Sequence, residues 1–159
     1  MEADDPAVIR FLEHTMVARV ATVSRSGRPS ITPLYFVRVK GRIWLGTAAW
    51  TLAAREAKAD PRVSVLFQLE RDPSERRILR IKGNGQVRVD EKTWHANERR
   101  TAFKYILTLP GLRHYLAHLK LARLNQHYHA QSAAKGPGCV IDVLPEVYEF
   151  LDENGSIQS

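Results

Sequence analysis

The feature that most constrains the fold is a run of β-strand patterns between residues 17 and 89, interrupted by a single short helix. Stretches rich in β-branched and aromatic residues alternate with turn sequences such as Ser26-Gly27 and Lys40-Gly41, which is typical of antiparallel strands. The pattern predicts strands over residues 17–24, 31–39, 43–47, 63–69 and 77–89, and a helix over residues 52–59. This order predicts a small β-barrel with a helix over one opening.

The short helix has clear start and stop signals. Thr51 is a favoured N-cap residue, and Asp60-Pro61 ends the helix because the residue before a proline is disfavoured in helical geometry. The strand after it, residues 63–69, is almost continuously apolar and is expected to be buried on both faces. The next strand alternates, and its Gly83 and Gly85 predict a bulge or a sharp bend.

Helices are expected at both ends of this β-rich region. Asp4 and Asp5 can cap a first helix that begins at Pro6 and ends near His14. Two further helices, over residues 93–107 and 112–130, form an insertion at about residues 91–134. A last strand follows over residues 139–144, and residues 147–151 add a short edge piece. We expect a single domain spanning residues 1–159.

Composition limits the class of protein without choosing a function. The chain has 159 residues, 44% hydrophobic and 26% charged, as is usual for a globular domain. Its longest apolar runs are well short of the ~20 residues of a membrane span, and no signal peptide is evident at its acidic start. The lone Cys139 fits a reducing compartment, so we expect a cytoplasmic protein. A net charge of +7 favours anionic ligands.

Several short motifs, in this order, resemble the pyridoxamine 5′-phosphate oxidase-like family of FMN-binding split barrels. They are Gly27-Arg28-Pro29 at the second strand, Thr47 at the end of the third, Asp60-Pro61-Arg62-Val63-Ser64 after the helix, Arg80-Ile81-Lys82-Gly83, and Pro145 followed by Glu149-Phe150. The resemblance implies a mainly β fold with helices: a six-stranded antiparallel split barrel with the helical insertion before its last strand.

The same resemblance implies a flavin-dependent oxidoreductase that acts on a small molecule. Its members are homodimers that hold FMN, or in some branches a deazaflavin coenzyme or haem, in clefts between the subunits. In such proteins the cofactor supplies the chemistry and the chain supplies position and electrostatics, so no catalytic side chain is assigned. The cofactor-binding positions that it implies are Thr32, Pro33, Leu34, Thr47, Trp50, Thr51, Arg55 and Lys58.

The chain departs from the family pattern at two phosphate-binding positions. By counting from the shared motifs, the family's cations correspond to Thr32 and Ala53, which leaves Arg55 as the favoured cationic contact. The amides at the helix N-terminus also favour an anion. The family's C-terminal Arg-x-His-x-x-Arg element is absent as well, so oxidation of pyridoxamine itself is not expected.

Other interpretations of the same residues stay open. Trp50 is either an aromatic wall beside the cofactor or a core or interface residue, whereas Trp44 is expected in the core. His114 and His118 have the spacing of a metal-binding pair, but the polar flank of an amphipathic helix explains them better, and no metal site is expected. His127 and His129 are interpreted as surface residues.

Two other classes of function compete with the oxidoreductase. The first is a non-catalytic flavin- or haem-binding or sensing protein on the same fold, which the missing cations favour. The second is a nucleic-acid binder that uses the basic helical segment around Arg99 and Arg100. We consider nucleic-acid binding the weakest of the three, because the positive charges are spread around the helices.

Overall fold

The computed structural model describes residues 2–107, 116 and 135–158. Within them the chain forms three α-helices, one π-helical turn and eight strands. In chain order they are α1 (Pro6–His14), β1 (Ala18–Val23), β2 (Pro29–Leu34), β3 (Phe36–Val39), β4 (Arg42–Ala48), α2 (Leu52–Ala59), β5 (Arg62–Gln68), β6 (Ile78–Arg88), α3 (Glu91–Ala102), η1 (Phe103–Leu107), β7 (Gly138–Leu151) and β8 (Ile157–Gln158).

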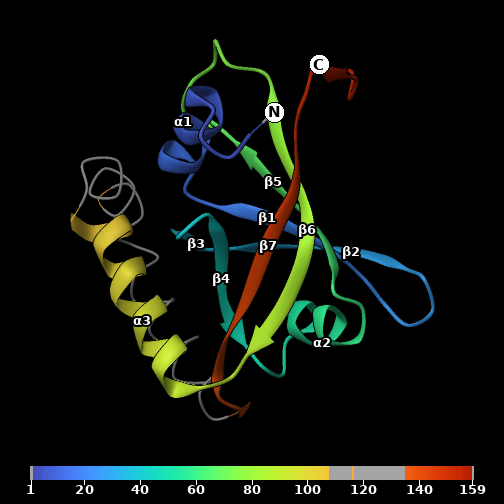
Figure 1. Ribbon diagram of the computed structural model, residues 1–159, viewed down its shortest axis with the longest axis vertical. Helices are drawn as coiled ribbons and strands as arrows, with labels where there is room; N and C mark the ends of the chain where they lie inside the picture. The colour runs from blue at the N-terminus through green and yellow to red at the C-terminus, as the bar shows by residue number, and fades with distance from the viewer. Residues whose placement is uncertain (1, 108–115, 117–134, 159) are drawn as a thin grey trace.

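The strands form one curled antiparallel sheet in the order β2-β1-β5-β6-β7-β4-β3, with β8 paired to β7 (Figure 1). The strands β2 and β3 lie at the two opposite ends of this order, yet only Tyr35 separates them along the chain. The sheet must therefore curl until its two ends meet, and the amide of Gly46 donates to the carbonyl of Tyr35 at 3.2 Å. The predicted mainly β split barrel is confirmed.

The number of strands differs from the expected six for two reasons. The segment expected as one strand over residues 31–39 divides at Tyr35, because its first half pairs with β1 and its second half with β4. The two-residue strand β8 adds another. In the opposite direction, the two pieces expected over residues 139–144 and 147–151 form the single long strand β7.

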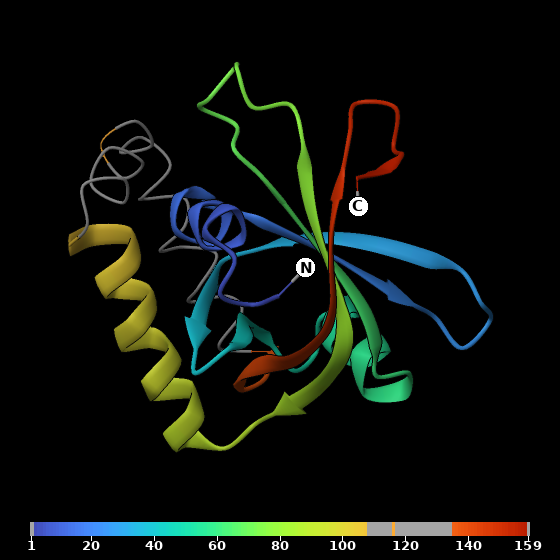
Figure 2. The same cartoon turned by 45° about the horizontal axis from the view of Figure 1, so that its top comes forward.

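The capping signals at the first two helices are confirmed. The carboxylate of Asp5 accepts from the amide of Ala7 at 2.8 Å, and Pro6 occupies the first position of α1. Thr51 caps α2, which spans the expected residues. The helix α1 contributes Val8 and Phe11 to the core inside the barrel, and Figure 2 shows α1 and α2 well apart on the curled sheet.

The interior is filled by alternate residues of each strand, as β-strand geometry requires. In β6 the side chains of Leu79 and Ile81 are fully buried. The expectation that β5 is buried on both faces was wrong: Val63, Val65 and Phe67 are buried, while the residues between them are only half-buried. The outer face of β5 is therefore available for contact with another molecule.

The free edge of β2 is blocked by two prolines. The amide of Ser24 donates to the carbonyl of Arg28, and the alternation of antiparallel pairs then turns the backbone amide positions of Pro29, Ile31 and Pro33 away from β1. Two of these three positions have no N–H, so the edge offers little for a further strand to pair with.

The β6–β7 pairing shifts register between Lys82 and Gly83, where the glycine pattern predicts an irregularity, because Glu146 of β7 is an extra residue that forms a β-bulge opposite them. A Cβ atom at Gly83 would lie 2.1 Å from the carbonyl oxygen of Leu144, so no larger residue fits there without a backbone shift. The bulge bends β6 and β7 together along their shared length.

The insertion is described in part. The helix expected over residues 93–107 exists as α3 followed by the π-helical turn η1. The helix expected over residues 112–130, with His114, His118, His127 and His129, lies outside the described residues. None of the described helices is long and apolar enough to cross a membrane.

The placement expected for Trp44 in the core was wrong. Its neighbours in sequence, Ile43 and Leu45, are buried in the barrel, so Trp44 points to the outer face of β4. There the guanidinium carbon of Arg100 on α3 lies 5.6 Å from the centre of the indole ring.

Candidate functional site

The N-terminus of α2 is organised around the hydroxyl of Thr51. This hydroxyl donates to the carbonyl of Ala48 at 2.8 Å and accepts from the amide of Ala54 at 3.4 Å. The hydroxyl of Thr47 lies 3.1 Å away. Because the Thr51 proton is already used, Thr47 must be the donor between the two hydroxyls. Both protons are therefore spent within the protein, and neither threonine can donate to a bound phosphate without breaking one of these bonds.

The exposed face of α2 carries two cations, Arg55 one turn from the N-terminus and Lys58 in the last turn. Arg55 and Lys58 are exposed, and their side chains have no hydrogen-bond or ion-pair partner among the described residues. Leu52 is 52% exposed beside them. Ala53, by contrast, is fully buried in the core, so a longer cationic side chain at that position would point into the barrel.

A buried carboxylate fixes α2 to the first hairpin. Glu56 is 6% exposed, accepts a hydrogen bond from the hydroxyl of Thr22 at 2.6 Å and contacts the hydroxyl of Ser30. The burial of Glu56 was not predicted from the sequence, because a glutamate on a short polar helix normally faces solvent. The partners that explain its burial come from strands that are 26 and 34 residues away.

The three candidate residues of β2 do not share a face. Thr32 and Leu34 lie opposite Val20 and Ala18, whose side chains are buried, so these two point toward the interior. Pro33 points to the outer face and is exposed. The structure therefore places Thr32, but not Pro33, on the side of the sheet where α2 packs.

Trp50 is half-buried and is covered by a cation that the sequence analysis did not assign. The ammonium of Lys135 lies 5.0 Å from the centre of the indole ring. A hydrogen bond from the amide of Ala49 to the carbonyl of Pro137, 3.0 Å long, holds the two segments together. In sequence, residues 135–138 show only a turn, so nothing local signals that Lys135 reaches the start of α2.

Little else in the described region suggests reactive chemistry. Cys139 is fully buried, and burial raises the pKa of its thiol to about 11, so it is protonated and inert at neutral pH. The residues that the structure describes contain no group of three or more His, Cys, Asp or Glu side chains arranged to hold a metal ion.

Comparison with known proteins identifies the family. The family model described as pyridoxamine 5′-phosphate oxidase matches residues 5–152, which is nearly the whole chain. The chain belongs to this family. Its motifs and its split barrel are thus explained by common descent, and the family resemblance of the sequence is confirmed. A search of curated proteins found no match to the sequence.

Solved structures with the same fold include proteins of several kinds. The conserved hypothetical protein Rv2991 of Mycobacterium tuberculosis superposes with a TM-score of 0.67 at 16% identity, over 94% of this chain and 84% of that one. An F420 reductase gives 0.59 at 20% identity, over 87% and 93%. HutZ, the haem storage protein of Vibrio cholerae, gives 0.60 at 16% identity, over 93% of both chains. At these identities the likeness shows the fold alone.

The donor set at the start of α2 fits a phosphate-bearing cofactor of this family. The amides of the first helical turn, the exposed Arg55 and Lys58, and the nearby Lys135 supply positive charge and N–H donors. The exposed Leu52 adds apolar surface beside them. This arrangement differs from the pattern that the family resemblance implies. Arg55 and Lys58 lie one turn or more from the start of α2, and Lys135 comes from the segment before β7.

Proposed function

We propose that the protein is a flavin-dependent oxidoreductase that binds FMN, or a deazaflavin coenzyme, at the start of α2 and acts on a small molecule. The observation that carries the proposal is the pair of exposed cations on α2, Arg55 and Lys58, which have no partner among the described residues. Exposed cations on a helix are common. Here two of them lie on the same exposed face of one short helix, in a chain of the pyridoxamine 5′-phosphate oxidase family.

In the proposed complex the chain binds and orients the cofactor. Arg55 and the first-turn amides of α2 hold the phosphate, and Lys58 adds charge at longer range. Trp50 and Leu52 provide apolar surface for the rings, and Lys135 keeps Trp50 in place through its contact with the indole. The bound ring system supplies the hydride or electron transfer.

We further propose that two copies of the chain form a dimer, as the family resemblance implies. The outer face of β2 and its neighbours supports this, because Ile31 is 63% exposed and Pro33 and Tyr35 are also exposed beside it. Isolated exposed apolar residues are ordinary, but Ile31 and Pro33 of β2 and the adjoining Tyr35 make a surface that a second subunit can cover.

Reconstitution tests the cofactor. The purified protein is mixed in turn with FMN, a deazaflavin coenzyme and haem, desalted, and its visible spectrum is recorded. We expect retention of FMN or the deazaflavin, and a loss of affinity of about tenfold or more in Arg55→Gln/Lys58→Gln, since two charge-assisted contacts are removed. Arg71→Gln, an exposed cation of the β5–β6 loop, is the matched control. Failure to retain any of the three cofactors contradicts the proposal.

The second candidate function is storage or sensing of a cofactor without turnover. It is favoured by the hydroxyls of Thr47 and Thr51, which are used internally, and by Ala53, which replaces a family cation. The two functions are separated by adding a reductant to the loaded protein. A flavin band that bleaches and returns with an added electron acceptor supports the oxidoreductase, and an intense Soret band after haem addition supports haem binding.

A further inference from the structure

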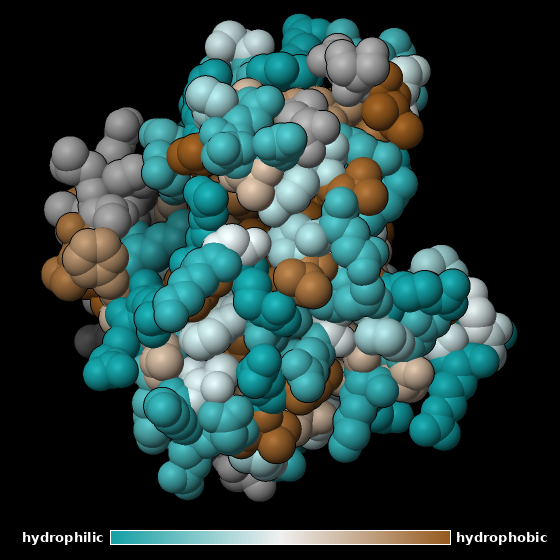
Figure 3. Space-filling model, viewed as in Figure 1, coloured by the Kyte–Doolittle hydropathy of each residue, from teal (hydrophilic) through white to brown (hydrophobic). Residues whose placement is uncertain are grey.

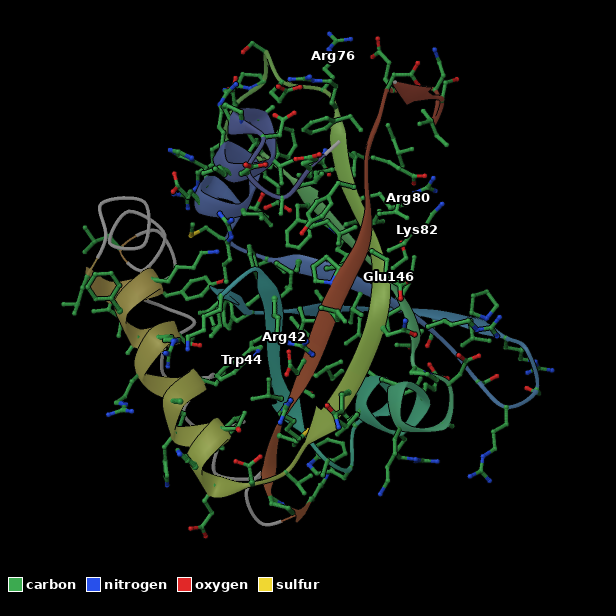
Figure 4. All side chains as sticks on the ribbon, viewed as in Figure 1. Arg42, Trp44, Arg76, Arg80, Lys82 and Glu146 are labelled. Carbon is green, nitrogen blue, oxygen red and sulfur yellow. The ribbon has the colours of Figure 1, made fainter. Side chains whose placement is uncertain are left out.

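A second group of charged residues lies away from α2, on the outer face of β4, β7 and β6. At its centre is Asp142, which is 1% exposed. It accepts from Nε of Arg42 at 2.6 Å and from Nε of Arg88 at 2.7 Å. Two cations on one carboxylate leave a net positive charge. Figure 4 shows Arg42 and Trp44 together on β4, between β7 and α3.

The guanidinium groups of Arg42 and Arg88 are only partly used. Each donates one hydrogen bond to Asp142, through Nε, and their terminal nitrogens have no partner among the described residues. Other arginines of the chain are used more fully. Arg62 and Arg77 each hold both oxygens of a neighbouring carboxylate with Nε and Nη2.

Arg80 makes the closest comparison, because it lies on the same strand as Arg88. Its Nε and Nη2 both contact Glu149, at 2.7 and 2.6 Å. The side chains of Arg42 and Arg88 are 30% and 40% exposed, so their unused N–H groups are accessible to solvent. Fixed by Asp142 and turned outward, these groups have the geometry that binds phosphate or carboxylate oxygens.

An independent observation at the same place points to a missing polar group. The indole Nε1 of Trp44 and the amide Oδ1 of Asn97 are both buried and have no hydrogen-bond partner in the part of the chain that the structure describes. Asn97 is 4% exposed and its amide lies against Gly46, two residues along β4 from Trp44. A buried polar atom without a partner destabilises the fold, so two of them at the contact between α3 and β4 call for an explanation.

Few side chains of α3 are buried against the sheet. The helix α3 contributes one buried residue, Asn97, and otherwise rests on Trp94 and Arg100. The face of the molecule that Figure 3 shows is mostly hydrophilic, with scattered apolar residues. The indole N–H of Trp44 is buried beside α3, so a shift of this helix would expose it as a further donor on the face that carries the two guanidinium groups.

We propose that Arg42 and Arg88, held by Asp142, form a binding site for the oxyanion of a small molecule, phosphate or carboxylate, and that α3 moves to let Trp44 join it. The oxyanion accepts from the terminal nitrogens of both arginines and from the indole N–H. A hydroxyl or amine on the same ligand donates to Asn97. This site is separate from the proposed cofactor site, which uses α2 and Trp50.

The test uses the full chain and inorganic phosphate, with acetate as the second arm, at constant ionic strength. The probe is the indole N–H signal of Trp44 in a ¹H–¹⁵N spectrum, assigned by Trp44→Phe. We expect a saturable shift of this signal, and an apparent affinity at least tenfold weaker in Arg42→Lys/Arg88→Lys. Lysine keeps the charge next to Asp142 and loses the paired terminal N–H groups. Arg80→Lys is the matched control and is expected to bind as the unmodified protein does.

The outcomes are distinct. A shift with phosphate alone assigns a phosphate-bearing ligand, and a shift with acetate alone assigns a carboxylate. No shift, or one that is equal in the double lysine variant, shows adventitious anion association only and overturns the proposal. If the double variant does not fold, Arg88→Gln replaces it, because Arg42 still pairs with Asp142. The site could instead bind a carboxylate side chain of a second copy of the chain. In that case the double lysine variant changes the oligomeric state and leaves phosphate binding intact. That result also overturns the proposal.

Discussion

Lys104 shows how much of a residue's behaviour depends on contacts that are remote in sequence. Its ammonium lies 3.3 Å from the centre of the Phe36 ring and donates to the carbonyl of Leu12 near the end of α1, at 3.1 Å. Burial lowers the pKa of Lys104 to about 7, against a smaller opposing effect of the Glu13 charge. The π-helical turn η1 places the side chain there, and π-helical turns are rare and often mark special positions.

We predict that Lys104 makes the stability of the protein rise with pH above neutrality. The pKa of this lysine is lower in the folded than in the unfolded state, so between pH 7 and about pH 10 the unfolded chain binds the extra proton. Stability then increases with pH through this window, whereas below it the unfavourable contribution of the buried charge of Lys104 is constant. Urea unfolding at pH 7 and pH 9.5 measures the gain, which we expect to be about 3 kcal/mol.

The matched variant is Lys104→Met, which keeps most of the apolar stem without a titrating group. The rise in stability between pH 7 and pH 9.5 is expected to be smaller in this variant by about 1 kcal/mol or more. Lys58→Met, at an exposed position on α2, is the control and should leave the rise unchanged. An equal rise in all three proteins contradicts the assignment to Lys104.

At the scale of elements, the close approach of β6 and β7 depends on the absence of a side chain at Gly83. A Cβ at Gly83 would meet the carbonyl group of Leu144, with 2.1 Å to its oxygen and 3.0 Å to its carbon. At Gly85, two residues on, a Cβ would meet only methyl groups of Ile141 and Val63, at 3.1 and 3.3 Å. A backbone carbonyl at a bulge cannot move without disturbing both strands, whereas methyl groups can rotate or shift.

We therefore predict that Gly83→Ala lowers the free energy of unfolding by about 2–4 kcal/mol, and Gly85→Ala by about 1 kcal/mol. Denaturant unfolding followed by far-UV circular dichroism measures both. Both positions are glycines of β6. The difference between the two losses in free energy of unfolding therefore isolates the effect of the β7 backbone close to Gly83. Equal losses in the two variants would show that the bulge tolerates a side chain.

The elements were predictable where their signals are local. The cap of Thr51 and the stop at Asp60-Pro61 define α2 to the residue, and alternation identified the buried face of β6. The division at Tyr35 was not predictable, because both halves have strand propensity and only their different partners separate them. For the same reason Trp44 was misplaced: an apolar run does not show which residues face the barrel.

The candidate site was predictable only in part. Thr51 and the exposed face of α2 follow from helix periodicity. Lys135 and Glu56 do not, since Lys135 lies 85 positions from the indole that it covers and Glu56 is buried only because Thr22 and Ser30 face it. Contacts between distant segments decide which polar groups are used, and a single sequence carries no local trace of them.

At the scale of the whole molecule, the helices that the structure describes leave part of the curled sheet uncovered. In Figure 2 the β1–β2 hairpin extends away from α1 and α3, and α2 packs against one of its faces. The opposite face carries Ile31 and Pro33 in the open. The blocked edge of β2 opposes strand-to-strand association, so a partner is expected to meet the face of this hairpin rather than its edge.

We predict that Ile31→Glu converts the proposed dimer into a monomer. The substitution removes the burial of one large apolar side chain, about 1.5–3 kcal/mol for each subunit, and places an unpaired charge in the contact. The dissociation constant should rise by a factor of about a hundred or more. Sedimentation velocity over a range of protein concentrations measures it. Ile157→Glu, which is similarly exposed at 57% against 63%, is the control.

The Ile31→Glu variant also distinguishes loss of the dimer from loss of the fold. Ile31 is exposed in the single chain and is not part of the core, so the monomer should keep its circular dichroism spectrum while it loses its partner. If the cofactor lies between subunits, as the sequence resemblance implies, the monomer should also retain less flavin than the Ile157→Glu control. A monomer that retains flavin fully would place the cofactor within one chain, and an Ile31→Glu protein that remains dimeric would place the contact on another face of the sheet.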